Sequence, residues 1–243
     1  MSTQILNAET YSGAEAVRGD AATMSYGGVI AKSLFLLVLT VICAVVGWDL
    51  AADAVPQSGM WFFLGYILLI ALTFAAAGNP KIALPAGVLY ALLMGTWMGA
   101  ISRVYEDYYE GIVGAAIGVT LMVFLATLLL YATRVIRVTA RFAAVMTIAL
   151  CGILFLYLFG WLLSIFGADL NFLNEPTPTG IAIQIAIAVI AALSLTLDFS
   201  FIETGVEQGA PKDYEWYTAF GLQTTLVWLY LEILKLLALL ANR

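Results

Sequence analysis

The chain has 243 residues, of which 63% are apolar and only 11% are charged. A soluble domain of this size is about 45–50% apolar and about 25% charged, so these proportions exclude an ordinary soluble fold. The chain contains no histidine, which excludes imidazole-based metal sites, catalytic triads and pH switches. Its net charge of −6 argues against nucleic-acid binding.

The first 24 residues are polar and small, and they lack the early positive charge and short apolar core of a cleavable signal. We expect residues 1–24 to form a flexible cytoplasmic tail and residues 25–243 to form one transmembrane domain. Apolar runs of about twenty residues are too long for the strands of an outer-membrane barrel, and they predict an all-α polytopic membrane protein. The seven predicted spans are 28–50, 60–77, 82–101, 112–131, 142–166, 181–201 and 217–240.

Lysine and arginine are distributed unequally between the two sets of loops that these spans define. One side carries seven of them: Arg18, Lys32, Lys81, Arg134, Arg137, Arg141 and Lys212. The other side carries Arg103 together with several acids. By the positive-inside rule, we expect a cytoplasmic amino terminus and an outer carboxyl terminus, in the inner membrane of the cell.

Two of the predicted spans contain glycines at a four-residue spacing. Gly95 and Gly99 lie in the third span, and Gly114 and Gly118 lie in the fourth. Glycine at this spacing allows helix backbones to approach closely. The pattern therefore predicts that these two helices pack on each other or on neighbouring helices.

Two acidic residues lie inside consecutive predicted spans, Asp198 in the sixth and Glu232 in the seventh. An ionisable group inside a span costs about 3 kcal/mol or more to bury, so it normally faces a partner, a cavity or a permeation path. If the two carboxyl groups meet in the bundle interior, they share one proton and form the pH switch open to a chain without histidine. Carboxylate oxygens also bind Ca²⁺, so the same pair is a candidate metal site.

Each of these acids also has a purely structural interpretation. Lys235 follows Glu232 by three residues, a helical contact spacing, so the two can form an intrahelical pair. Asp198 lies near the cytoplasmic end of its span and can be hydrated there. Lys32 and Lys235 lie near span ends, where a long side chain can carry its ammonium group to the membrane surface. Neither acid lies in the Gly-x-Gly-Asp motif of intramembrane aspartyl proteases, and we expect no enzymatic activity.

The carboxyl-terminal third of the chain carries a distinctive pattern. It combines the string Trp228-Leu229-Tyr230-Leu231-Glu232 before an aliphatic helix, the lone acid Asp198 near the end of the preceding span, and the sequence Gly-Ala-Pro-Lys-Asp-Tyr-Glu-Trp at 209–216. With seven spans, this pattern resembles the Bax-inhibitor family (transmembrane BAX inhibitor motif proteins), in its bacterial branch. The resemblance extends from about residue 27, through Asn79-Pro80-Lys81, to the end of the chain.

The resemblance implies a bundle in which six helices surround a central, carboxyl-terminal seventh. It also implies a pH-sensitive calcium leak channel, with a paired acidic sensor between the last two helices that corresponds here to Asp198 and Glu232. Lys81 is the candidate for a basic residue that contacts this pair, and Lys235 is a further accessory residue. This chain departs from the family pattern in having Glu at the second acid and a longer connection between the last two spans.

The expected components of the system follow from this resemblance. We expect a monomer in the lipid bilayer, with protons and permeant Ca²⁺ as its ligands and with no cofactor. Two other functions remain open at this level. One is a non-conducting regulatory protein that binds other membrane proteins, such as a membrane protease. The other is a proton-coupled transporter that uses the same two acids.

Overall fold

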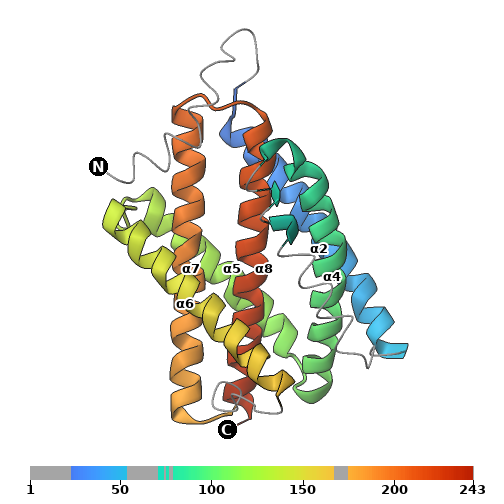
Figure 1. Cartoon of the computed structure of the whole chain (residues 1–243). Helices are drawn as coiled ribbons and strands as arrows, with labels where there is room; N and C mark the ends of the chain where they lie inside the picture. Colours follow the sequence, from blue (N-terminus) through green and yellow to red (C-terminus); the bar gives the residue numbers. More distant parts are fainter. Residues whose placement is uncertain (1–22, 54–70, 74, 77–78, 167–174, 243) are drawn as a thin grey trace.

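The computed structural model describes residues 23–53, 71–73, 75–76, 79–166 and 175–242, and they are almost entirely helical (Figure 1). The helices are α2 (Tyr26–Asp53), the 3₁₀ turn η2 (Pro80–Ile82), α4 (Ala83–Tyr108), α5 (Ile112–Ala132), α6 (Ala140–Ile165), α7 (Pro178–Glu207) and α8 (Asp213–Ala241). Among the described residues, six helices are long and apolar enough to cross a membrane. The predicted all-α polytopic fold is confirmed.

Six of the seven predicted spans each correspond to one of these helices. The second, 60–77, falls mostly outside the described residues, and its described positions 71–73 and 75–76 are helical. The observed helices run past several predicted ends: α4 continues to Tyr108 and α7 to Glu207. Their polar last turns lie beyond the apolar run from which each span was predicted. Of the predicted tail, residues 1–22 lie outside the described part, while the backbone N–H of Met24 donates to Ala210 O at 2.8 Å.

Local sequence explains how α4 begins and how it connects to α5. The Asn79 side chain accepts a hydrogen bond from the backbone N–H of Lys81 at the start of η2, as a helix cap does. Gly111 joins α4 to α5 with φ of 81°, a conformation that glycine adopts without strain. The Glu106 carboxylate then accepts from the N–H groups of Gly111 (2.6 Å) and Val113 (2.9 Å), which caps α5.

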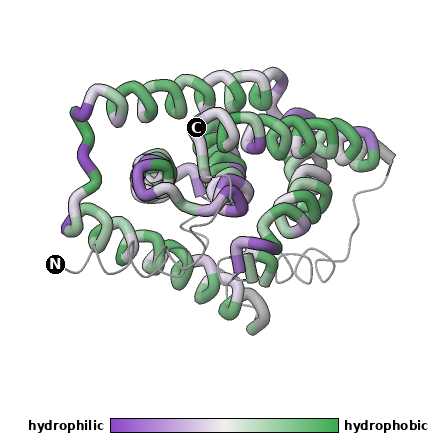
Figure 2. Tube along the Cα trace, turned by 90° about the horizontal axis from the view of Figure 1, so that it is seen from above, coloured by the Kyte–Doolittle hydropathy of each residue, from purple (hydrophilic) through white to green (hydrophobic). Residues whose placement is uncertain are grey.

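The helix α8 lies at the centre of the bundle. It runs antiparallel to α7, and it also packs against α2, α4 and α5 (Figure 1). Seen from above, α5 and α6 lie on opposite sides of the α7–α8 pair (Figure 2). This arrangement agrees with the central carboxyl-terminal helix that the sequence resemblance implies.

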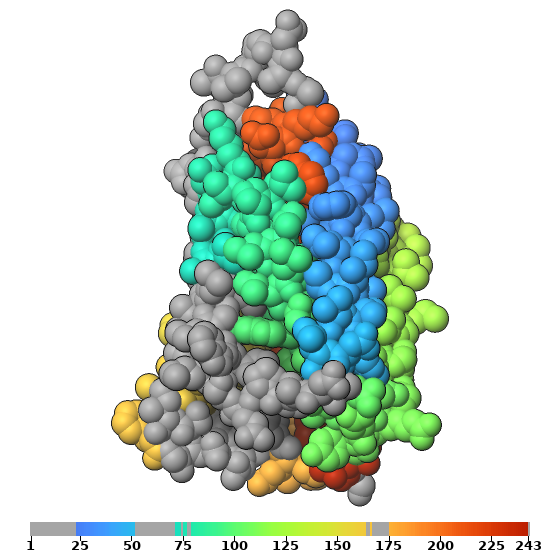
Figure 3. Space-filling model, turned by 90° about the vertical axis from the view of Figure 1, so that its right-hand side faces the viewer, coloured from blue at the N-terminus to red at the C-terminus, as the bar shows by residue number. Residues whose placement is uncertain are grey.

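The helices α2 and α4 lie side by side and form one face of the molecule (Figure 3). The glycine pair Gly95 and Gly99 of α4 faces α2, and a Cβ atom on Gly99 would lie only 1.8 Å from the carbonyl oxygen of Ala44. In the other direction, a Cβ atom on Gly47 would lie 1.9 Å from the carbonyl oxygen of Thr96. The close packing predicted for the first glycine pair is therefore confirmed, and its partner is α2.

The second glycine pair behaves differently. A Cβ atom added at Gly114 or Gly118 of α5 would meet no atom within 4 Å among the described residues. Instead, α5 buries Ala116 and Thr120 against its neighbours. The prediction that this second pair mediates helix packing is therefore wrong for the described part of the chain.

Replacing Gly99 by valine should destabilise the protein, because the new side chain would overlap the α2 backbone. Overpacking of this kind costs about 1–3 kcal/mol. Thermal unfolding of the detergent-solubilised protein should show a clear drop in Tm for Gly99→Val. The matched variant Gly118→Val, on the open side of α5, should unfold like the unaltered protein. An equal drop in both variants would contradict the assigned contact.

Candidate functional site between α7 and α8

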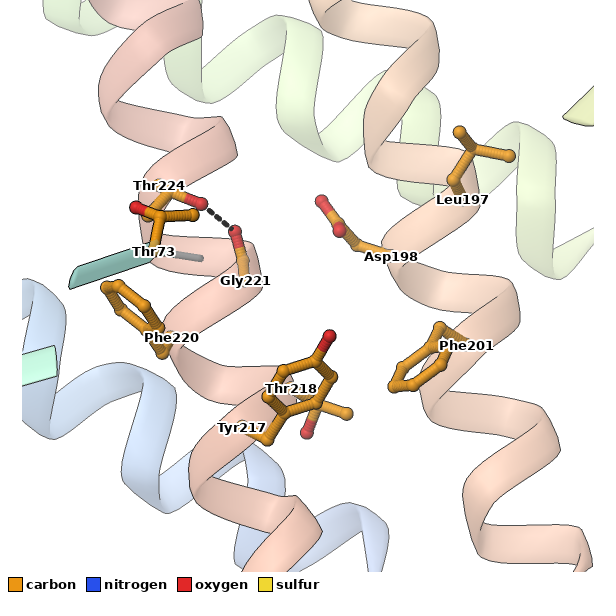
Figure 4. A pocket seen from close by; sticks show the side chains of 9 residues that line it. All are labelled: Thr73, Leu197, Asp198, Phe201, Tyr217, Thr218, Phe220, Gly221 and Thr224. Carbon is orange, nitrogen blue, oxygen red and sulfur yellow. Dashed lines mark hydrogen bonds between the residues drawn. The ribbon is translucent and has the colours of Figure 1, made fainter. Parts of the chain in front are cut away.

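Asp198 lies on α7, and its carboxyl group points toward α8 (Figure 4). The facing residue is Gly221, where a Cβ atom would lie 3.9 Å from Asp198 Oδ1. The other carboxyl oxygen, Oδ2, is buried and has no hydrogen-bond partner among the described residues. The Asp198 side chain is thus turned toward the bundle interior, although the residue as a whole is half-buried. One of its oxygens is left without compensation inside the bundle.

A pocket of about 280 Å³ lies beside this carboxyl group. Its walls come from α7, α8 and the described part of the second span: Thr73, Leu197, Asp198, Phe201, Tyr217, Thr218, Phe220, Gly221 and Thr224 (Figure 4). The rings of Phe201 and Tyr217 meet edge to face, with centroids 5.6 Å apart. Both lie about one turn closer than Asp198 and Gly221 to the α7–α8 connection. They therefore line the pocket on its side toward that connection.

Glu232 lies elsewhere, in a fully hydrogen-bonded environment. Its Oε1 accepts from the Tyr157 hydroxyl of α6 at 2.8 Å and from Trp228 Nε1 of α8 at 2.7 Å. Its Oε2 accepts from Gln184 Nε2 of α7 at 2.6 Å. A carboxyl group can accept such hydrogen bonds through both of its oxygens. The geometry therefore gives Glu232 the role of joining α6 and α7 to α8.

The predicted contact between Asp198 and Glu232 is not formed. Glu232 lies level with Gln184, and Asp198 follows Gln184 by 14 residues (198 − 184), which is roughly 21 Å along an α-helix. At that separation the two carboxyl groups cannot share a proton or bind one Ca²⁺ ion. Among the described residues, no group of three or more acids or cysteines is close enough to hold a metal ion.

The two accessory lysines are also placed differently from the expectation. The ammonium of Lys235 lies 5.9 Å from the centroid of the Tyr157 ring, a cation–π contact, and it makes no ion pair with Glu232. Lys81 is exposed in η2 and has no ion-pair partner among the described residues. Neither lysine contacts Asp198.

A buried ion pair between α2 and α8 was not predicted from the sequence. Lys32 Nζ lies 2.6 Å from Glu215 Oε2, and the Glu215 side chain is 1% exposed. Ser25 donates to the other oxygen from its backbone N–H (2.9 Å) and its hydroxyl (3.0 Å). Gly28 leaves room for this carboxylate, because a Cβ atom there would lie 2.2 Å from it. The Lys32 ammonium is therefore paired with an acid in the first turn of α8.

Two further hydrogen bonds connect α8 to its neighbours. Gln223 Nε2 donates to Thr40 Oγ1 of α2 at 2.7 Å, and the hydroxyl groups of Tyr230 and Ser102 of α4 lie 2.7 Å apart. Both contacts are buried. Together with Glu215 and Glu232, they attach α8 by polar contacts to α2, α4, α6 and α7.

The separation of the two acids can be tested by cross-linking in a variant that lacks both native cysteines. A short bifunctional thiol reagent should link Gln184→Cys to Glu232→Cys, because these side chains are in contact. The matched pair Asp198→Cys and Glu232→Cys should not be linked by the same reagent. Both pairs share the Glu232 substitution, so the effect of that substitution on folding is common to them. Efficient linking of the second pair would contradict the observed geometry.

The buried ion pair predicts a specific pattern of stabilities. Lys32→Met should destabilise the protein by about 3–5 kcal/mol, because it leaves the Glu215 carboxylate buried without a counter-charge. The double variant Lys32→Met/Glu215→Leu should be more stable than Lys32→Met alone, since no charge is left unpaired. Lys81→Met, at the same end of the bundle, should have little effect. Unfolding in denaturant measures all four proteins, and a double variant no more stable than Lys32→Met would contradict a direct pair.

The comparison with known families agrees with this architecture. The family described as Bax inhibitor 1 like matches residues 4–242, which is nearly the whole chain. Searches of curated proteins and of solved structures returned no match. The chain therefore belongs to the Bax inhibitor 1-like family of multi-pass membrane proteins.

Proposed function

We propose that this protein is a pH-sensitive cation leak, with Ca²⁺ as the permeant ion and Asp198 as the gating residue between the last two helices. The observation that carries the proposal is the buried, unpartnered Oδ2 of Asp198 beside the pocket between α7 and α8. The proposal departs from the two-acid sensor that the sequence favoured, because it assigns the response to one carboxyl group.

A carboxylate without a counter-charge explains why protons and cations compete at this site. An ionised group in an apolar environment is costly unless a counter-charge neutralises it, and here none of the described side chains supplies one. A proton makes Asp198 neutral, while a cation can be held by the ionised form. Proton binding therefore opposes cation entry.

The ligand chemistry of the pocket also fits a leak for a hard cation. Besides the carboxylate, the walls present hydroxyl oxygens, and the Thr224 hydroxyl donates its proton to the Gly221 carbonyl at 2.7 Å. Its lone pairs then remain free to face a cation. A site with one carboxylate binds Ca²⁺ weakly, since affinity rises with the number of charged ligands. Weak binding suits permeation, because the ion must also leave.

In this proposal Glu232 has no gating role. Its charge is already satisfied by three donors on α6, α7 and α8. We expect these contacts to stabilise the bundle by joining α6 and α7 to α8.

We also propose that the protein lies in the inner membrane of a cell with its amino terminus in the cytoplasm. The end of the bundle where α7 meets α8 carries the basic residues that the positive-inside rule places in the cytoplasm. These residues are Lys32, Lys81, Arg134, Arg137, Arg141 and Lys212. The Asp198 pocket then lies in the cytoplasmic half of the membrane.

The test is Ca²⁺ flux into liposomes that contain the purified protein. The flux is measured at intervals between about pH 5 and 8, a range of roughly three units over which carboxyl groups in a membrane exchange a proton. Flux should increase with pH, because the ionised fraction of Asp198 increases with pH. Asp198→Asn should lower the flux at high pH by about tenfold, the change that ~1.4 kcal/mol at a barrier produces, and should abolish the pH dependence. Asp213→Asn, an exposed acid at the start of α8, is the matched control and should behave like the unaltered protein.

Other outcomes distinguish the alternatives. Equal flux from Asp198→Asn and the unaltered protein at every pH would contradict the proposal. Absence of flux, together with capture of a stoichiometric membrane-protein partner, would favour a regulatory function. Saturable uptake of a solute driven by a pH gradient would favour a transporter.

A further inference from the structure

A second pocket, of about 380 Å³, lies where the carboxyl end of α5 approaches α7. It is lined by Tyr131, Arg134, Arg137, Val138, Ser200 and Glu203. Unlike the Asp198 pocket, its lining is dominated by charged and hydroxyl groups. It belongs to the end of the bundle where α7 meets α8, and none of its residues takes part in the proposed cation pathway.

Arg134 is held in this pocket at a conformational cost. Its φ of 59° lies in the left-handed region, which is common just past a helix end but is normally occupied there by glycine. Its guanidinium donates to both carboxylate oxygens of Glu203, with Nη1 3.2 Å from Oε2. The Tyr131 hydroxyl donates to the same carboxylate. The charge of Glu203 is therefore committed to Arg134, and the pair fixes the end of α5 to α7.

Arg137 supplies a positive charge that is not neutralised in the same way. Its Nε donates to the backbone carbonyl of Arg134 at 3.3 Å, and it has no ion-pair partner among the described residues. Two guanidinium groups and one carboxylate give the pocket a net charge of +1 (2 − 1). Glu207 lies one turn beyond Glu203 on α7 and is exposed, so water screens its charge. Glu207 nevertheless opposes a ligand with two negative charges.

We propose that this pocket binds a phosphate group, with the phosphodiester of an anionic phospholipid headgroup as the favoured source. The planar guanidinium fork matches phosphate oxygens in geometry and charge. A net charge of one favours a singly charged phosphodiester over a doubly charged phosphomonoester. The position also fits a lipid: Leu129 and Val135, next to the pocket in sequence, are 63% and 70% exposed and offer apolar surface to acyl chains.

Native mass spectrometry of the full-length protein in detergent tests this assignment. The probe is phosphatidylglycerol, titrated in parallel with phosphatidylcholine, whose headgroup carries no net charge. The unaltered protein should retain phosphatidylglycerol preferentially. Arg137→Gln should weaken its binding by about tenfold, the typical effect of one charge-assisted contact. Arg141→Gln removes the same charge at the same end of the bundle but outside the pocket, and it should bind like the unaltered protein.

The outcomes separate the site from general surface charge and from the ion pathway. Equal losses in Arg137→Gln and Arg141→Gln, or equal retention of the two lipids, would overturn the proposal. Displacement of phosphatidylglycerol by millimolar inorganic phosphate would keep the phosphate site and assign it a soluble ligand. Asp198→Asn should retain full lipid binding, so the test of the lipid site is independent of the test of the cation leak.

Discussion

Lipid supplies no hydrogen bonds, so polar side chains buried on α8 depend on partners within the protein, and several of these partners lie on other helices. Lys32 of α2 pairs with Glu215, Ser102 of α4 with Tyr230, and donors from α6 and α7 with Glu232. Apolar packing alone would specify α8 poorly in a membrane, because lipid tails are as apolar as leucine side chains. The polar contacts fix its rotation and depth, since a shift by one turn would break all of them together.

Three buried side-chain atoms among the described residues lack a hydrogen-bond partner: Asp198 Oδ2, Ser33 Oγ and Gln223 Oε1. Only the first belongs to an acid, and this separates the two intramembrane acids by environment. Glu232 is held by three donors from α6, α7 and α8. Asp198 has a buried oxygen without a partner and a pocket beside it. Unsatisfied buried groups are rare in native structures and concentrate where a protein does chemistry or transport. A single responsive carboxyl group also exchanges one proton, whereas a shared pair would titrate in two coupled steps.

The sequence was sufficient to predict the helices, because apolar runs of membrane length leave few alternatives, and to single out Asp198 as a lone acid in a span. The wrong contact between Asp198 and Glu232 came from not considering register. In an antiparallel helix pair, residues that are equally distant from a short connection lie opposite each other. Asp198 lies 9 residues before the end of α7 (207 − 198), and Gly221 lies 8 residues after the start of α8 (221 − 213). Glu232 lies 19 residues after that start (232 − 213), too far along α8 to face Asp198. Counting from the turn would have predicted Gly221. Counting from a connection could not predict the Lys32–Glu215 ion pair, because the two residues are 183 positions apart and Glu215 lies outside the predicted seventh span.

That long separation also has a consequence for biosynthesis. Chains grow from the amino terminus at about 5–20 residues per second, so the ribosome reaches Glu215 roughly 10–40 s after Lys32, given the 183 positions between them. During that interval α2 is already synthesised while its ammonium group has no counter-charge, and α8, the helix that organises the bundle, does not yet exist. The nascent protein therefore passes through a stage in which Lys32 of α2 lacks its Glu215 partner, and the synthesis of α8 ends that stage.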